Sequence, residues 1–219
     1  CWGRNEAGQL GDGSTFDHFL PRIVPSLRGV KQLAASWRVS CALLEDGKAR
    51  CWGSNELRDI GPWWRCIDPL RHGGPSACTS PREVPDVAAV THITASGCAI
   101  ARGDLVCWDG GGVLDHRTVK VVSDFGKVAA FDRSMNQTCA IDDRGAVRCL
   151  RRTLEDVFGA PRPPETVAGA ERARQLAVAP DHACALRDDD SVRCWGANTS
   201  GQLGSGTTDA HPAASVVGW

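Results

Sequence analysis

The chain has 219 residues, of which 42% are hydrophobic, 6% aromatic and 23% charged, and its net charge is -1. This length is sufficient for one large all-β domain or for two small ones. A net charge near zero argues against nucleic acid or an anionic membrane as an electrostatic partner. No run of 18 apolar residues predicts a membrane-spanning helix.

The N-terminal segment opens with Cys1-Trp2-Gly3 and continues into a glycine-rich turn at residues 8–13. Residues 194–206, near the other end, repeat this order. The glycines precede no Lys-Ser/Thr pair and open no helix, so the turn is not predicted to bind phosphate. An extended segment bounded by prolines (21–25) and a short apolar strand (30–35) follow the first copy.

The next element is a hairpin bracketed by Cys41 and Cys51. Residues 45–47 (Glu-Asp-Gly) predict a three-residue loop with Gly47 in the left-handed conformation. Counting outward from this loop places Cys41 opposite Cys51 at a non-hydrogen-bonded pair. There the Cα atoms lie about 4.5 Å apart, within the range of a disulfide. We therefore predict the disulfide Cys41–Cys51.

A long segment from Arg58 to Pro81 separates this hairpin from the next one. We expect it to stand out from the sheets as a rigid loop. It contains Trp63, Trp64 and Arg65, and this combination of residues is typical of interface hot spots. These three are the candidate partner-binding residues. In the alternative interpretation, the two indoles form a small core inside the segment.

Cys66 and Cys78 lie in the same segment, and we predict that they form a disulfide that holds it. A zinc site formed by Cys66, His72 and Cys78 is the competing interpretation. It lacks a fourth ligand and the close cysteine spacing of structural zinc sites. No metal ion or other cofactor is therefore predicted.

Three further hairpins have the cysteine spacing of the first. A two-residue turn at residues 102–103 and three-residue turns at 143–145 and 188–190 again place two cysteines opposite each other. The predicted disulfides are Cys98–Cys107, Cys139–Cys149 and Cys184–Cys194. The acidic turn 188–190 is expected to be solvated, because calcium would need further oxygen ligands at defined positions.

A tryptophan follows the second cysteine in four places: Trp2, Trp52, Trp108 and Trp195. An aromatic residue that recurs once per repeat favours packing between repeats over ligand binding. No Ser-His-Asp order, carboxylate pair or metal cluster stands out, so no catalytic residue is predicted and the chain is not expected to be an enzyme.

The second cysteines recur at intervals of 42 to 56 residues, with about four short strands in each interval. This pattern indicates an all-β protein, a β-propeller built from four-stranded blades. We expect a single repeat domain and an incomplete ring of about four blades plus part of a fifth. Its repeat units would be residues 1–50, 51–106, 107–148, 149–193 and, as a partial unit, 194–219.

Cys1 has no partner in this scheme. Its partner is expected on a strand that precedes residue 1, which would make the chain a piece of a longer protein. An open ring exposes strand edges. The disulfides are therefore expected to hold the fold, and their reduction is expected to unfold it.

Residues 1–13 and 194–206 carry the motif Cys-Trp-Gly-x-Asn-x-x-Gly-Gln-Leu-Gly. This motif resembles the regulator of chromosome condensation repeat, as do residues 21–24 and 182–186. In the middle units the Trp-Gly pair is altered at Asp109 and Leu150, and the Gly-Gln-Leu-Gly element is missing. The disulfide-bearing sequence is similar to a secreted bacterial branch of this family. The resemblance implies a propeller, in which His182 would bond the loop of a neighbouring blade.

Many paired cysteines predict an oxidising compartment, so the protein is expected to be secreted, periplasmic or on the cell surface. A ratio of 21 arginines to four lysines is typical of a GC-rich bacterial genome. The resemblance implies nucleotide exchange on a small GTPase as one function, but exchange factors work where cysteines are reduced. Resemblance to secreted β-lactamase inhibitory propellers implies an enzyme inhibitor, and a carbohydrate-binding surface protein is a further alternative. We expect a non-enzymatic extracellular scaffold that binds a protein partner.

Overall fold

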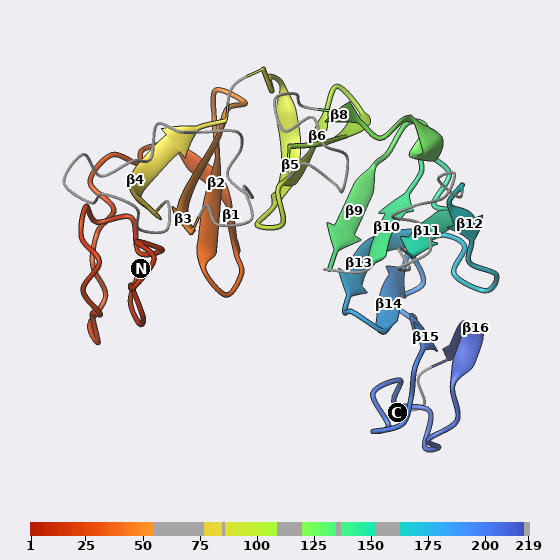
Figure 1. The fold of residues 1–219 in the computed structure, drawn as a ribbon. Coiled ribbons are helices and arrows are strands. Elements are labelled where there is room, and N and C mark those ends of the chain that lie inside the picture. The colour runs from red at the N-terminus through yellow and green to blue at the C-terminus, as the bar shows by residue number, and fades with distance from the viewer. Residues whose placement is uncertain (55–76, 85, 109–119, 135–136, 152–162, 217–219) are drawn as a thin grey trace, which may run out of the picture. The chain divides into compact units, whose positions relative to one another are not determined.

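The computed structural model describes residues 1–54, 77–84, 86–108, 120–134, 137–151 and 163–216 (Figure 1). In these ranges the regular secondary structure is β-strand, apart from one short 3-10 turn at Ser123–Phe125. The chain divides into two compact units, Cys1–Val121 and Val122–Trp219.

The first unit contains two antiparallel four-stranded sheets, and in each the strands lie in chain order. Blade 1 consists of β1 (Val30–Ala35), β2 (Val39–Leu44), β3 (Ala49–Ser54) and β4 (Ala77–Glu83). Blade 2 consists of β5 (Val90–Thr94), β6 (Cys98–Ala101), β7 (Asp104–Cys107) and β8 (Lys120–Val121).

The second unit has the same plan. Blade 3 consists of β9 (Ala130–Arg133), β10 (Gln137–Ile141), β11 (Val147–Arg151) and β12 (Glu165–Thr166). Blade 4 consists of β13 (Ala173–Val178), β14 (His182–Arg187), β15 (Val192–Gly196) and β16 (His211–Val216). The four-stranded blades expected from the repeat are thus present.

The blade boundaries differ from the repeat units counted along the sequence. Residues 194–219 were expected to open a fifth blade, but β15 and β16 are the outer strands of blade 4, where Gly196 pairs with His211. A blade begins one strand before its first cysteine and ends one strand after its second. At the start of the chain, Gly3 and His18 form the equivalent bridge, so the N-terminal segment has the pairing of an outer strand pair.

The hairpin registers place the cysteines as expected. Cys41 lies opposite Cys51, and the same is true of Cys98 and Cys107, of Cys139 and Cys149, and of Cys184 and Cys194. All four pairs lie at disulfide distance with Cα atoms 4.1 Å apart. Each bond joins the two central strands of one blade. Cys1 is exposed and unpaired within the described part of the chain.

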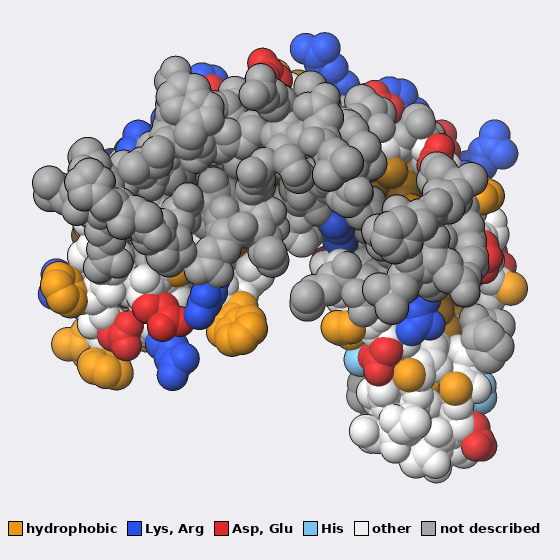
Figure 2. Space-filling model, in the orientation of Figure 1, with side chains coloured by type: hydrophobic (Ala, Val, Ile, Leu, Met, Phe, Trp, Pro, Cys, Tyr) orange, Lys and Arg blue, Asp and Glu red, His pale blue; other side chains and the backbone are white. Residues whose placement is uncertain are grey.

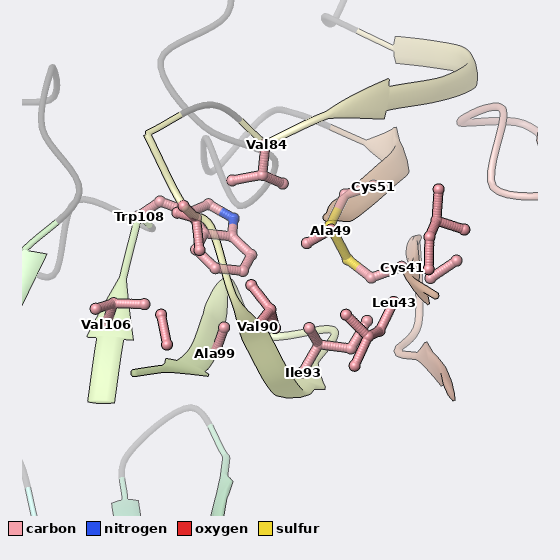
Figure 3. Close-up of a cluster of buried hydrophobic side chains, with 14 of the residues drawn as sticks. Cys41, Leu43, Ala49, Cys51, Val84, Val90, Ile93, Ala99, Val106 and Trp108 are labelled. Carbon is pink, nitrogen blue, oxygen red and sulfur yellow. A yellow bond between two sulfur atoms is a disulfide. The ribbon is translucent and has the colours of Figure 1, made fainter. Parts of the chain in front are cut away.

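Each unit has its own hydrophobic core. In the first unit, Leu43 of blade 1 packs in one cluster with Val90 and Ile93 of blade 2, beside the Cys41–Cys51 bond (Figure 3). In the second unit, the cluster includes side chains of blades 3 and 4. Burying an aliphatic side chain of this size stabilises a fold by about 1.5–3 kcal/mol. Packing between successive blades is therefore a main source of stability in each unit.

Candidate protein-binding surface

The glycine-rich turn of the N-terminal segment is organised by a buried asparagine. Asn5 Oδ1 accepts a hydrogen bond from the Leu10 N–H at 2.9 Å, and Asn5 Nδ2 donates to the Ser14 carbonyl at 3.1 Å. Gln9 Oε1 accepts from the Ala7 N–H at 2.9 Å. The turn satisfies its own polar groups, so it is a structural element.

The second copy of this turn repeats the same contacts. Asn198 Oδ1 accepts from the Leu203 N–H at 2.9 Å, and Asn198 Nδ2 donates to the Thr207 carbonyl at 2.8 Å. Asn198 is fully buried, as Asn5 is. The motif shared by residues 1–13 and 194–206 therefore encodes a loop geometry.

The first copy of the turn covers the tryptophan of blade 1. Trp52 Nε1 donates to the Gln9 carbonyl at 2.8 Å, and a Cβ added at Gly11 would lie only 2.6 Å from that nitrogen. Trp52, Trp108 and Trp195 are all buried, which confirms their packing role. Trp2 is 65% exposed and is the exception among the four.

The glycine that follows the tryptophan fixes the turn between the first two strands of its blade. A Cβ at Gly53 would lie 2.1 Å from the Arg38 carbonyl oxygen. In blade 4, a Cβ at Gly196 would lie 2.5 Å from the Asp181 carbonyl oxygen. Only glycine lets the two backbones approach this closely. The β1–β2 turn is thereby packed against the end of β3.

Trp37 lies on this turn and is 85% exposed. The guanidinium of Arg38 is 5.6 Å from the centroid of the Trp37 ring, within the range of a cation–π contact. Arg38 is also paired with Glu6 of the N-terminal segment at 3.1 Å. An exposed indole is thus presented on a backbone turn that its neighbours hold in place.

The large exposed apolar side chains all come from residues 1–37 in the described part of the chain. They are Trp2, Phe16, Phe19, Leu20, Ile23, Val30, Leu33 and Trp37. Figure 2 shows hydrophobic side chains on the surface of this N-terminal part of the molecule. Pro180 holds the position of Trp37 in blade 4 and is also exposed. The exposure of Trp37 therefore follows from its place at the tip of a hairpin.

Sequence reasoning did not single out Trp37. The signal available was a Trp-Arg pair at a turn between two strands. The residues that were singled out, Trp63, Trp64 and Arg65, lie outside the described residues, as does Cys66, so the Cys66–Cys78 bond and the zinc alternative stay predictions. Residues 77–81, expected to belong to the protruding segment, form most of β4 instead.

His182 was expected to bond the loop of a neighbouring blade, but its Nδ1 lies 2.8 Å from Asp181 Oδ1 on the same hairpin. The bond from His182 lowers the pKa of Asp181, although desolvation acts in the opposite direction. The acidic turn of blade 4 is solvated, as expected. Its carboxylates pair with Arg172, Arg174 and Arg187.

No group of three or more His, Cys, Asp or Glu side chains in the described residues could hold a metal ion. No helix in those residues is long and apolar enough to cross a membrane.

Comparison with known proteins gives matches to one kind of repeat and to several solved structures. A profile of the regulator of chromosome condensation (RCC1) repeat matches residues 1–43, and a second RCC1 repeat profile matches residues 30–57 and 174–202. Residues 1–57 and 174–202 therefore match the regulator of chromosome condensation repeat. Solved structures show the same fold: yeast RCC1 (Prp20) superimposes with a TM-score of 0.78 at 17% identity, covering 100% of this chain and 57% of that one. Human WBSCR16 superimposes with a TM-score of 0.73 at 20% identity, covering 100% and 62%.

Two curated proteins with similar sequences have names that describe different activities. The secretion-regulating guanine nucleotide exchange factor of Bos taurus is 28% identical over 209 residues, which are 93% of this chain and 37% of that protein. The E3 ubiquitin-protein ligase HERC2 of Homo sapiens is 24% identical over 204 residues, 90% of this chain and 3% of that protein. The chain thus spans little more than a third of the exchange factor and a small part of the ligase.

Proposed function

We propose that this RCC1-type chain is a non-catalytic scaffold that binds a protein partner through the turn carrying Trp37. The observation that carries the proposal is the exposed indole on a turn packed against Gly53, with the Arg38 guanidinium over the ring. Trp and Arg are the residues most enriched among interface hot spots. Burial of the indole by a partner would remove its apolar surface from water, and this would contribute favourable free energy to binding.

The partner is proposed to be met in an oxidising compartment, either outside the cell or in the periplasm. Support comes from the four blades, each with one cysteine pair at disulfide distance between its central strands. Disulfides persist in such compartments and are rare in the cytosol. Alkylation of intact cells before lysis, followed by mass measurement of the protein, tests this. All eight of these cysteines should be protected, and alkylation of any pair would contradict the proposal.

The binding site is tested with a photo-crosslinking amino acid in place of Trp37. The labelled chain is exposed to culture medium and cell-surface extract of the source organism. A discrete cross-linked protein is expected at this position, and Trp37→Ala should weaken its binding about tenfold or more. Trp2 is the matched control, because it is also an exposed tryptophan but does not belong to the β1–β2 turn. Equal cross-linking at Trp2 and Trp37 would contradict the assignment.

Residues Trp63, Trp64 and Arg65 are the second candidate surface. Replacement of both tryptophans by alanine in the same assay separates the two surfaces. Loss of binding in that variant, with Trp37→Ala unaffected, would move the site to the segment between β3 and β4 of blade 1. An enzyme among the cross-linked proteins, with its activity blocked, would identify the scaffold as an inhibitor. Binding to a panel of immobilised glycans would favour the carbohydrate alternative.

Nucleotide exchange on a small GTPase is the second candidate function. It is favoured by the 28% identity to a guanine nucleotide exchange factor over nearly the whole of this chain. Release of a fluorescent GDP analogue from a panel of small GTPases tests it with the oxidised chain. Accelerated release would replace the scaffold proposal, while unchanged release would leave it in place.

A further inference from the structure

The loop that follows the N-terminal glycine-rich turn carries a second exposed aromatic side chain. Phe16 is 75% exposed. On one side of it, Asp12 Oδ1 accepts a hydrogen bond from the Ser14 hydroxyl at 2.8 Å. On the other side, Asp17 Oδ1 accepts from the Asn5 N–H at 2.8 Å. Hydrogen bonds before and after Phe16 thus hold the backbone that presents it to solvent.

This loop and the turn that carries Trp37 form one continuous surface. Asp17 is bonded to the backbone of Asn5, and Glu6 is the next residue in the chain. Glu6 Oε1 accepts from Arg38 Nη2 at 3.1 Å, and the Arg38 guanidinium lies over the Trp37 ring. Figure 2 shows acidic and basic side chains beside hydrophobic ones in this N-terminal part of the molecule. We call this surface the acidic–aromatic patch, and it consists of Glu6, Phe16, Asp17, Trp37 and Arg38.

The exposure of the loop in this patch is a property of its positions in the repeat. The first copy of the glycine-rich turn packs on the tryptophan of the blade that follows it. The second copy extends from blade 4, which packs on the blade that precedes it. Thr199 and Asp209, which hold the positions of Glu6 and Phe16 in the second copy, are also exposed. Neither a following nor a preceding blade therefore covers these positions.

The loop carries an excess of negative charge. Residues 4–17 contain three carboxylates and a single guanidinium. Glu6 and Asp17 each use one carboxylate oxygen in a hydrogen bond, and the other oxygen accepts none from the described residues. In the second copy, Thr199 and Ala210 hold these two positions. The two carboxylates are thus particular to the first copy, and each has an oxygen available to a positively charged group.

We propose that the acidic–aromatic patch binds a linear protein segment in which a lysine or arginine is flanked by apolar side chains. This inference rests on the proposed function and names the chemistry of the partner. The basic side chain would pair with Glu6 and Asp17, and the apolar ones would contact Phe16 and Trp37. The order aromatic, acidic, aromatic across the patch matches the order apolar, basic, apolar along an extended segment. Complementary charge fixes the register of an interface, while buried aromatic side chains supply most of the affinity.

Panning of a phage-displayed library of linear peptides on the oxidised chain tests the proposal. The enriched peptides should contain a lysine or arginine between apolar residues. Their binding should weaken with rising salt, because ion pairs at an exposed patch are screened. A chain that enriches no peptide, or that enriches peptides without a basic residue, would overturn the proposal.

Two isosteric changes separate the charge of the patch from its hydrogen bonds. Glu6→Gln and Asp17→Asn each keep a side-chain oxygen that accepts from Arg38 or from the Asn5 N–H, so the fold should tolerate both. The double variant should bind the enriched peptides about tenfold more weakly and should lose most of the salt dependence. Asp209→Asn is the matched control, because it removes an exposed carboxylate of the second copy and should leave binding unchanged. Equal binding by the parent and the double variant would overturn the proposal.

The two aromatic side chains are tested with the same peptides. Phe16→Ala should weaken binding about tenfold or more, as should Trp37→Ala. Both side chains are exposed, so neither change should destabilise the fold. Unchanged binding by Phe16→Ala would contradict its place in the patch.

The cross-linking experiment at Trp37 separates this inference from the proposed function. A protein captured there that binds the Phe16→Ala variant and the Glu6→Gln, Asp17→Asn variant as tightly as the parent would overturn the inference and leave the proposed function in place. The absence of any protein captured at Trp37 would contradict the proposed function itself.

Discussion

The Trp52 indole donates a hydrogen bond to the Gln9 carbonyl oxygen, with 2.8 Å between the two atoms. The two residues are 43 positions apart in the sequence. The contact places the glycine-rich turn of the N-terminal segment over the tryptophan that follows the second cysteine of the blade 1 hairpin. It shows why the motif needs a glycine at residue 11, where a side chain would meet the indole.

The first prediction compares Gly11→Ala with Gly13→Ala. Both glycines have positive φ, 70° and 90°, so both changes introduce backbone strain of about 1–2 kcal/mol. Nothing lies within 4 Å of a Cβ at Gly13, whereas a Cβ at Gly11 would lie 2.6 Å from Trp52 Nε1. Gly11→Ala should cost about 1–3 kcal/mol more. Equal losses in chemical denaturation would show that the indole moves aside freely.

The second prediction concerns the buried asparagine of the second turn. Asn198→Ala removes the acceptor of the Leu203 N–H and the donor to the Thr207 carbonyl. Leaving a buried polar group unsatisfied costs about 1–3 kcal/mol. Asn198→Asp keeps the acceptor oxygen but places a carboxylate oxygen against the Thr207 carbonyl, so at neutral pH it should lose at least as much stability as Asn198→Ala. Thermal unfolding of the two variants measures the difference, and an alanine variant as stable as the parent would contradict the role of the network.

The third prediction concerns acid stability. Desolvation acts to raise the pKa of Asp12, but hydrogen bonds from the Ser14 hydroxyl and N–H outweigh it and hold the pKa below its usual value. A lowered folded-state pKa contributes stability above about pH 4, and that contribution is lost as the pH falls through the folded-state pKa.

Asp12→Asn should therefore be less stable than the parent at neutral pH, and the difference should shrink below pH 4. Chemical denaturation at a series of pH values measures it. Asp209→Asn is the control, because Asp209 is exposed and makes no hydrogen bond in the described residues. A parent and an Asp12→Asn variant that lose stability in parallel with acid would contradict the assignment.

The fourth prediction concerns the disulfides. Each closes a hairpin of about ten residues, which is worth about 2.7 kcal/mol in the chain-entropy account. The double variant Cys41→Ala, Cys51→Ala should lose about that much stability, provided the two alanines fill the buried position. Denaturation with and without reductant checks this: reductant should destabilise the parent more than the double variant. Equal effects would mean that this bond does not contribute.

Local features could be predicted from the sequence. The Glu-Asp-Gly loop at residues 45–47 fixes the register of its hairpin, and the register places Cys41 opposite Cys51. Loop length and the two-residue period of a strand are local properties. The position of the two cysteines could therefore be predicted in the same way for all four hairpins. The membership of residues 194–216 in blade 4 was not predictable in this way. A long loop separates β15 from β16, and the length of this loop does not indicate which strand β16 pairs with.

The sequence by itself determined the repeat, the four-stranded blades and the cysteine pairing, because each depends on residues close together in the chain. Only the tertiary structure decided which apolar side chains are free. Leu33 and Ile93 have the same register and the same neighbouring alanine in the sequence, yet one is exposed and the other is buried. The difference arises because blade 1 packs against the strand that carries Ile93. Such burial depends on residues that are distant in the sequence, so it cannot be predicted from a local sequence pattern.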